Sequence, residues 1–138
     1  MTTSEPSFPS TFPATISSTS ETPAIKAAIQ KYFDGFLGQD TSALRAAFHP
    51  DAKLIAVSDG AVSGMLTSDW FSRIDARRQA GTIPTPGEAI VISIDQTDNA
   101  AVGKVRITFP THTFVDYLSL LKAENGWQIV NKIYAVLE

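Results

Sequence analysis

The first clear pattern in the chain is a run of apolar side chains that recur every three or four positions. It comprises Ile25, Ala28, Ile29, Tyr32, Phe33, Phe36 and Leu37. This spacing predicts an amphipathic helix that Gly38 stops, and Thr22 before Pro23 suits an N-cap with proline in the first turn. Asp40 is placed to cap a second, shorter helix, which we expect to end at Pro50.

The hydrophobic period then changes from helical to alternating, which is typical of strands. The expected strands cover residues 53–58, 61–66, 88–96, 101–109, 111–123 and 127–137. Asp59-Gly60 favours a tight hairpin turn, and Thr67 or Ser68 is placed to cap a third helix that ends at Gly81. Early helices followed by a late run of antiparallel strands predict an α+β fold.

Residues 1–22 have a different composition from the rest of the chain. Ser, Thr and Pro dominate them, and such a segment buries too little apolar surface to offset the entropy of ordering it. We expect either a disordered tail or a strap anchored by Phe8 and Phe12. Residues 23–138 are then expected to form a single domain.

Composition excludes several classes of function. The 138 residues contain no Cys, so disulfides, cysteine metal sites and thiol redox chemistry are excluded. No apolar run is long enough to span a bilayer. Eleven Lys and Arg against fourteen Asp and Glu argue against a nucleic-acid or membrane-surface partner, and we expect a cytoplasmic protein.

The late strands are apolar at nearly every position, as in Ile90-Val91-Ile92 and in 114–121. A half-solvated sheet would alternate strictly between apolar and polar side chains. A sheet that is apolar on both faces must bury both of them, and the predicted helices can cover only one face. The pattern therefore predicts a homodimer that packs through the outer face of the sheet.

The order of these elements resembles the nuclear-transport-factor-2-like superfamily, which includes ketosteroid isomerases, polyketide cyclases and scytalone dehydratase. The resemblance is carried by FHPDA at 48–52 and by GWQIVNK at 126–132. DYLSLLK at 116–122 most resembles the branch labelled putative lumazine-binding. The resemblance implies a cone-shaped, curved antiparallel sheet wrapped by three N-terminal helices, a pocket at the open end, and a dimer.

The resemblance also implies roles for two residues. Tyr32 matches the tyrosine that ketosteroid isomerases use as an oxyanion donor; the alternative is a core tyrosine. Asp116 lies near the position of their protonated aspartic acid, and a carboxylate in an apolar strand is costly unless it is paired or neutralised. Its alternatives are an interface contact or a pair with Lys104, Arg106 or Lys132.

The third position of the isomerase site differs. The catalytic base would fall on Ala56, Val57 is no substitute, and Asp59 lies at a hairpin tip. Without a base at the substrate α-carbon, the proton-transfer contribution of about 10²–10⁴-fold is lost. Direct steroid-type isomerisation is therefore disfavoured.

The two histidines are further candidates. His49 is placed either to cap a helix end or to act as an acid–base group near the pocket rim. His112 is expected to share a face with Asp116, about 13 Å away along the strand, so a direct dyad is excluded. Two histidines and scattered carboxylates predict neither a metal site nor a cofactor.

Trp70 and Asn131 complete the candidate ligand contacts. Trp70 either stacks on a flat ligand or packs in the core. Asn131 is expected to share a face with Trp127 and Ile129, where an amide contacts a ligand or secures the dimer.

These residues favour a protein that binds a flat carbonyl-bearing or heteroaromatic molecule through Tyr32, Trp70, His112, Asp116 and Asn131. The alternative is a metal-free isomerase, cyclase or dehydratase that uses Asp116, Tyr32 or His49 in acid–base chemistry. A third possibility is a purely structural protein whose interior is filled with side chains.

Overall fold

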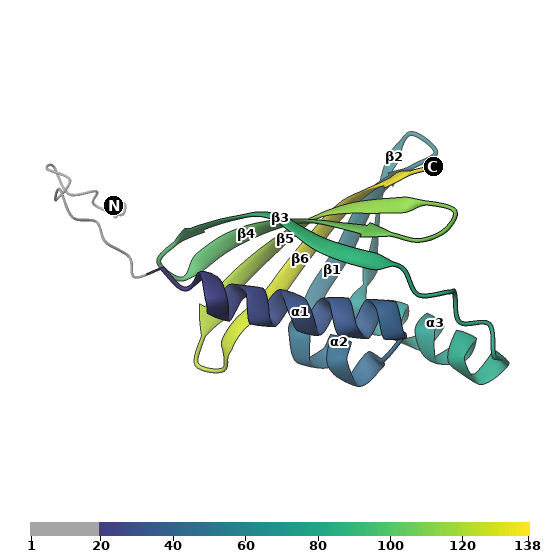
Figure 1. The fold of residues 1–138 in the computed structure, drawn as a ribbon, viewed down its shortest axis with the longest axis horizontal. Helices are drawn as coiled ribbons and strands as arrows, with labels where there is room; N and C mark the ends of the chain where they lie inside the picture. Colours follow the sequence, from purple (N-terminus) through teal and green to yellow (C-terminus); the bar gives the residue numbers. More distant parts are fainter. Residues whose placement is uncertain (1–19) are drawn as a thin grey trace, which may run out of the picture.

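The computed structural model describes residues 20–138, which form three helices on one face of a curved, unclosed six-stranded sheet (Figure 1). The proposed anchors Phe8 and Phe12 lie outside the described residues. The elements in chain order are α1 (Thr22–Gly38), α2 (Thr41–Ala47), β1 (Phe48–Ser58), β2 (Ala61–Leu66), α3 (Thr67–Ala80), β3 (Glu88–Thr97), β4 (Ala100–Thr108), β5 (Thr113–Ala123) and β6 (Gly126–Leu137). The α+β prediction is confirmed.

The sheet has the strand order β2-β1-β6-β5-β4-β3. Each neighbouring pair is antiparallel except β1 and β6, which run parallel. The final strand therefore lies between the early hairpin and the three late strands. This arrangement brings β6 close to α1 and α2, which pack beneath the sheet.

The predicted helix caps are partly confirmed. Asp40 caps α2, since its side chain accepts hydrogen bonds from the backbone amides of Ser42 and Ala43 at 3.0 and 3.4 Å. Thr22 and Thr67 are instead the first residues of their helices, and neither α1 nor α3 has a side-chain cap. In α1, the fixed φ of proline within the first turn supports the start of the helix without a cap.

The second helix is shorter, and its following strand longer, than the sequence predicts. β1 begins at Phe48, although Pro50 was expected to end a helix there. The ladder to β6 is broken between Phe48 and Lys53, and Pro50 lies in this interruption. A strand tolerates proline at such an irregularity because no ladder hydrogen bond is required of it.

The hairpin prediction is confirmed. Asp59 and Gly60 both have positive φ, 51° and 79°, as a tight turn between β1 and β2 requires. Gly81 ends α3 in the left-handed conformation, as expected. In the last turn before it, Arg77 and Arg78 donate to the side-chain and backbone oxygens of Gln39, and so tie the end of α3 to the end of α1.

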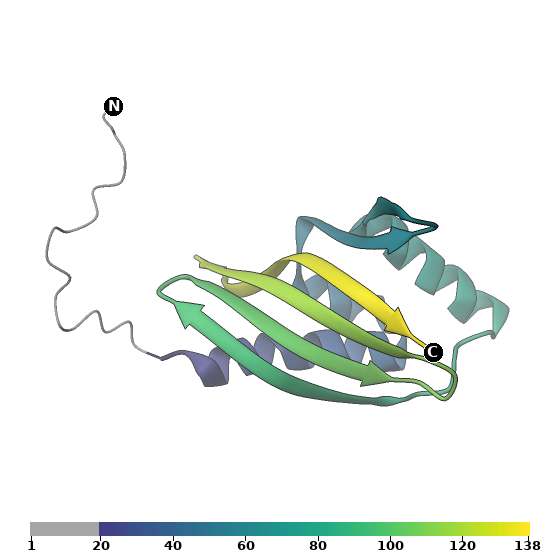
Figure 2. The ribbon, with the colours of Figure 1, turned by 90° about the horizontal axis from the view of Figure 1, so that it is seen from above.

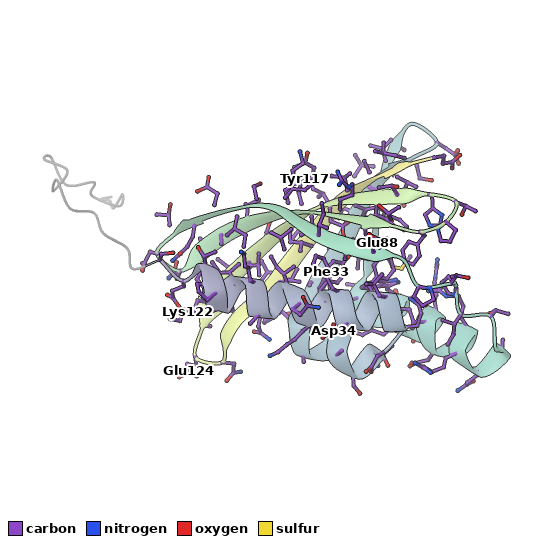
Figure 3. All side chains as sticks on the ribbon, viewed as in Figure 1. Phe33, Asp34, Glu88, Tyr117, Lys122 and Glu124 are labelled. Atoms are coloured by element: carbon purple, nitrogen blue, oxygen red, sulfur yellow. The ribbon has the colours of Figure 1, made fainter. Side chains whose placement is uncertain are left out.

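The two faces of the sheet differ sharply. The inner face packs on the helices, and Phe33 lies between α1 and the sheet in Figure 3. Viewed from above in Figure 2, the strands lie in front of the helices, and this outer face carries Tyr117 (Figure 3). The outer side chains Val102, Leu121 and Ile133 are 46–49% exposed. Among residues 20–138, no helix is long and apolar enough to cross a membrane.

A β-bulge in β6 determines which side chains reach the interior. Leu120 pairs with Ile129 and Ser119 pairs with Asn131, so Val130 is an extra residue on β6. Trp127 and Ile129 face inward before the bulge, and Lys132 faces inward after it, opposite the buried Leu118. Asn131 pairs with Ser119 on the outer face. The expectation that Asn131 shares a face with Trp127 and Ile129 was wrong, because the bulge reverses the alternation.

Candidate functional site

Three polar side chains from different elements meet inside the apolar core. Tyr32 comes from α1, Asp116 from β5 and Lys132 from β6, and they are 0%, 0% and 2% exposed. The Lys132 ammonium donates to the Tyr32 hydroxyl at 2.7 Å, and that hydroxyl donates to Asp116 Oδ2. Lys132 Nζ lies 3.7 Å from the same carboxylate oxygen. We call these three residues the buried triad.

Aromatic rings enclose the amine of the triad. Lys132 Nζ lies 4.9–5.9 Å from the ring centroids of Tyr32, Phe36, Trp70, Phe114 and Tyr134. Ring faces attract a cation, and they exclude the water that would otherwise solvate it. We call these five rings the aromatic cage. A positive charge on Lys132 is therefore stabilised by Tyr32, Asp116 and the ring faces instead of by water.

The surroundings oppose charge on every member of the triad. Burial lowers the pKa of Lys132, and the nearby Asp116 carboxylate opposes that shift. Burial raises the pKa of Asp116, while the charge of Lys132 and the hydrogen bond from Tyr32 counteract it. Burial, followed by the neighbouring carboxylate, raises the pKa of Tyr32. The tyrosine therefore remains protonated. For the lysine and the aspartate, burial favours the neutral form of each side chain.

The triad leaves hydrogen-bonding capacity unused. Within residues 20–138, Asp116 Oδ1 is buried and has no hydrogen-bond partner. An ammonium has three N–H donors, and Lys132 directs one at Tyr32, whereas its distance to Asp116 exceeds a normal hydrogen bond. The interior thus offers an acceptor and a donor side by side. That pair is complementary to a ligand with a carbonyl oxygen next to an N–H or O–H group.

Two hollows adjoin the aromatic cage. One of about 320 Å³ includes Phe36 and Phe114 of the cage. Its other lining residues are Gln39, Arg77, Thr82, Pro84, Phe109 and His112. The second, of about 560 Å³, lies over β1, β2 and β6 and includes Tyr134 of the cage. Each hollow is thus lined by at least one ring that also faces the amine of Lys132.

Of two residues singled out from the sequence, Trp70 lies beside the triad and His112 lines a hollow that adjoins the cage. Trp70 belongs to the cage and packs edge-on against Phe36 and Phe48. His112 precedes β5, stacks on Phe109 and lines the 320 Å³ hollow. Both positions are compatible with contact to a flat ligand.

His49 and Asn131 are not brought to the triad. His49 Nδ1 accepts the backbone amide of Asp51 at 3.0 Å rather than capping a helix, because β1 has already begun at that point. It lines a cleft with Leu121 and Val130. Asn131 pairs with Ser119 on the outer face, because the bulge at Val130 reverses the alternation of β6.

Lys132 is the site residue that sequence reasoning did not select, beyond naming it as one possible partner of Asp116. The structure identifies it as that partner, whereas Lys104 lies over the Tyr117 ring on the outer face. At the isomerase base position, Ala56 lines the 560 Å³ hollow, and its described lining residues include no carboxylate. In the part of the chain that is described, no group of three or more His, Asp or Glu is placed to hold a metal ion.

Comparison with solved structures supports the fold. The chain is similar to an NTF2-like protein of unknown function from Shewanella baltica, with 26% identity, 88% of this chain and 99% of the other covered, and a TM-score of 0.75. It also resembles a ketosteroid isomerase-like protein from Erwinia carotovora atroseptica, at 15% identity and a TM-score of 0.66, with 88% and 99% covered. The second likeness, at such low identity, concerns the fold alone.

Comparison of sequences adds a named relative and a family. The chain is 26% identical over 115 residues to aldolase FrzH of Cladobotryum sp., a match that covers 83% of this chain and 90% of the relative. Residues 20–135 match the family described as putative lumazine-binding. Family and fold together suggest a small-molecule-binding protein. With nearly all of its described residues matched, the chain belongs to the putative lumazine-binding family, within the nuclear-transport-factor-2-like superfamily.

Proposed function

We propose that this protein binds a flat carbonyl-bearing or heteroaromatic molecule in its interior and recognises the polar edge of that molecule with the buried triad. The unpartnered Asp116 Oδ1 beside the Lys132 amine carries the proposal. Burial of an unsatisfied carboxylate oxygen is costly, and a ligand N–H or O–H would remove that cost.

The surroundings of the triad support a flat ligand. Aromatic side chains surround the amine, and they offer ring faces on which a planar molecule can stack. The two buried ionic groups, Asp116 and Lys132, lie at one place among aromatic side chains, so they would orient the ligand rather than merely attract it. The Tyr32 hydroxyl, which is hydrogen-bonded to both Lys132 and Asp116, would keep their side chains at fixed positions. Trp70 would stack on the ligand.

A matched pair of probes tests this proposal. 2-Quinolone is a flat bicyclic lactam with a carbonyl next to an N–H, and naphthalene has the same outline without either group. If each polar group makes one hydrogen bond, the lactam should bind more tightly by about 1–3 kcal/mol, which is about 5- to 150-fold. Binding is measured from Trp70 fluorescence in a Trp127→Phe background, which leaves a single tryptophan.

The Tyr32→Phe variant serves as the control for the triad. It keeps the ring and removes the hydroxyl that joins the other two members, so the preference for the lactam should fall towards naphthalene. Equal affinity of the unsubstituted triad for both probes would refute recognition by the triad. A preference that survives Tyr32→Phe unchanged would place recognition elsewhere.

One observation favours an enzyme as the second candidate. The relative from Cladobotryum sp. is named an aldolase, and aldol chemistry needs a carbonyl compound and an acid–base group. Asp116 and Tyr32 would supply the acid–base groups, and no metal is invoked. His49 is the weaker candidate because its described contacts are with the start of β1. Acceleration by the protein of α-proton exchange in acetone, followed by NMR in deuterated water, would support this candidate, and loss of exchange in Asp116→Asn is required.

We further propose that two copies pack through the outer face of the sheet. Tyr117 and Ile133 are cross-strand neighbours, 41% and 49% exposed, on the face opposite the helices. Val102 and Leu121 extend this apolar patch over β4 and β5. Exposed apolar patches of this kind mark interaction surfaces, and closed symmetric dimers are the commonest assemblies.

Sedimentation at micromolar concentration tests the dimer. Ile133→Glu, which places a carboxylate in the patch, should yield monomers, whereas Ala76→Glu on α3 adds the same charge to the helical layer and should leave the dimer intact. A monomeric unsubstituted protein, or equal effects of the two variants, would refute this proposal.

A further inference from the structure

The amine of Lys132 lies in an environment that suits covalent chemistry. Fewer than about one in a thousand ordinary lysines are neutral at pH 7, and only the neutral amine is a nucleophile. Burial lowers the pKa of Lys132, and each unit of lowering makes the neutral fraction about tenfold larger. This amine is also held in place, by a 2.7 Å hydrogen bond to Tyr32 inside the core.

The triad provides the proton transfers that an amine nucleophile needs. Lys132 donates to the Tyr32 hydroxyl, which donates to Asp116, so a proton leaving the nitrogen has a continuous path to a carboxylate. The other carboxylate oxygen has no partner among the described residues and is free to bind a proton or a hydroxyl group. The other titratable group facing the amine is Tyr134, whose ring centroid lies 4.9 Å from Nζ.

We propose that Lys132 forms an imine with aldehydes and ketones that enter the aromatic cage, an inference that rests on the carbonyl-binding role proposed above. The amine lone pair attacks the carbonyl carbon, a C–N bond forms, and the carbonyl π electrons move to oxygen. One proton passes from nitrogen to that oxygen through Tyr32 and Asp116. The resulting carbinolamine loses its hydroxyl with a second proton as water, which leaves a C=N bond.

Access to the amine would be from the 320 Å³ hollow. Phe114, half-buried in β5, lines this hollow, and its ring centroid lies 5.9 Å from Lys132 Nζ. Phe36 borders the same hollow and the same amine. Phe114 and Phe36 are therefore the two cage rings that would have to turn for a molecule in this hollow to reach the nucleophile.

Acetylacetone is the probe for this proposal. With a lysine amine it forms an imine that rearranges to a conjugated enaminone, which absorbs in the near ultraviolet and needs no reductant to persist. The protein should gain the mass of one acetylacetone less one water. Peptide mapping should locate the adduct on Lys132, with a labelled fraction at neutral pH higher than that of Lys104, because burial lowers the pKa of Lys132.

Two variants and one independent measurement make the result decisive. Lys132→Met should abolish the absorbance, and Lys104→Met, which removes a lysine on the outer face, should leave it unchanged. Labelling spread evenly over the lysines of the unsubstituted protein, or located elsewhere, would overturn the proposal even if Lys132→Met fails to fold.

Binding of 2-quinolone separates the imine from the binding function, because 2-quinolone is a lactam and forms no imine under these conditions. If it binds while Lys132 stays unlabelled, the imine is refuted and the binding function stands; if it does not bind, the binding function itself fails.

Discussion

Replacing Lys132 by methionine and replacing Asp116 by asparagine should each destabilise the protein, with opposite dependence on pH. Each change leaves one buried ionisable group of the pair without its charged partner. Breaking a buried ion pair in this way typically costs about 3–5 kcal/mol. The remaining group avoids part of that cost by becoming neutral, and neutralisation has a free energy that depends on pH.

In Lys132→Met, Asp116 must bind a proton on folding. Burial already raises the pKa of this carboxyl, and the variant removes the positive charge that opposes the shift. Relative to an unfolded pKa of about 3.9, protonation costs about 4 kcal/mol at pH 7 and about 1.5 kcal/mol at pH 5. The folded state then holds one more proton than the unfolded state. The loss of stability should therefore grow as pH rises.

In Asp116→Asn, Lys132 must lose a proton on folding. Burial lowers the pKa of this amine, and the variant removes the carboxylate that opposes the shift. Relative to an unfolded pKa of about 10.4, deprotonation costs about 4.6 kcal/mol at pH 7 and about 2 kcal/mol at pH 9. The unfolded state holds the extra proton in this case. The loss of stability should therefore grow as pH falls.

Urea unfolding of both variants and of the double variant, at about pH 5, 7 and 9, measures these slopes of about 1.4 kcal/mol per pH unit. The double variant has no titratable group left in the pair, so its difference from the unsubstituted protein should not vary with pH. If the free energy of unfolding lost in the two single variants depends on pH in the same direction, Lys132 and Asp116 are not a coupled, desolvated pair.

Three further predictions concern single side chains and are each checked by equilibrium unfolding. Tyr32→Phe removes a buried hydroxyl bonded to two ionisable partners and should lower the free energy of unfolding by about 1.5–3 kcal/mol; no change would mean that this hydrogen-bonded link is not formed. Gly35→Ala places a Cβ 2.6 Å from Leu44 Cγ and should cost about 1–3 kcal/mol, whereas Gly38→Ala in the same helix meets nothing within 4 Å and should be neutral or stabilising by up to about 1 kcal/mol. Asp40→Ala removes the N-cap of α2 and should cost about 1 kcal/mol, and a cost below about 0.5 kcal/mol would show that the cap contributes little.

The sequence predicts the elements well where their signals are local. The helical spacing from Ile25 onward and the turn at Asp59-Gly60 predict α1 and the first hairpin, because each pattern depends on residues close together in the chain. The start of β1 at Phe48 is missed, since proline at position 50 normally excludes a strand and only the interrupted ladder to β6 permits it.

The site is predicted in part, for a similar reason. Asp116 draws attention because a carboxylate in an apolar strand needs a partner, and Tyr32 because of the family resemblance. Lys132 is missed because strict alternation from Trp127 would place it on the solvent face. The bulge at Val130 reverses that alternation. In addition, β6 pairs in parallel with β1, a strand far away in the sequence, and local patterns do not predict such a pairing.

A crystal structure of the protein with bound 2-quinolone would show whether the buried triad recognises the ligand. We expect the lactam inside the aromatic cage, with its oxygen within about 3 Å of Lys132 Nζ and its N–H directed at Asp116 Oδ1. A lactam bound on the outer face of the sheet, or one in the interior whose polar edge points away from the buried triad, would contradict it.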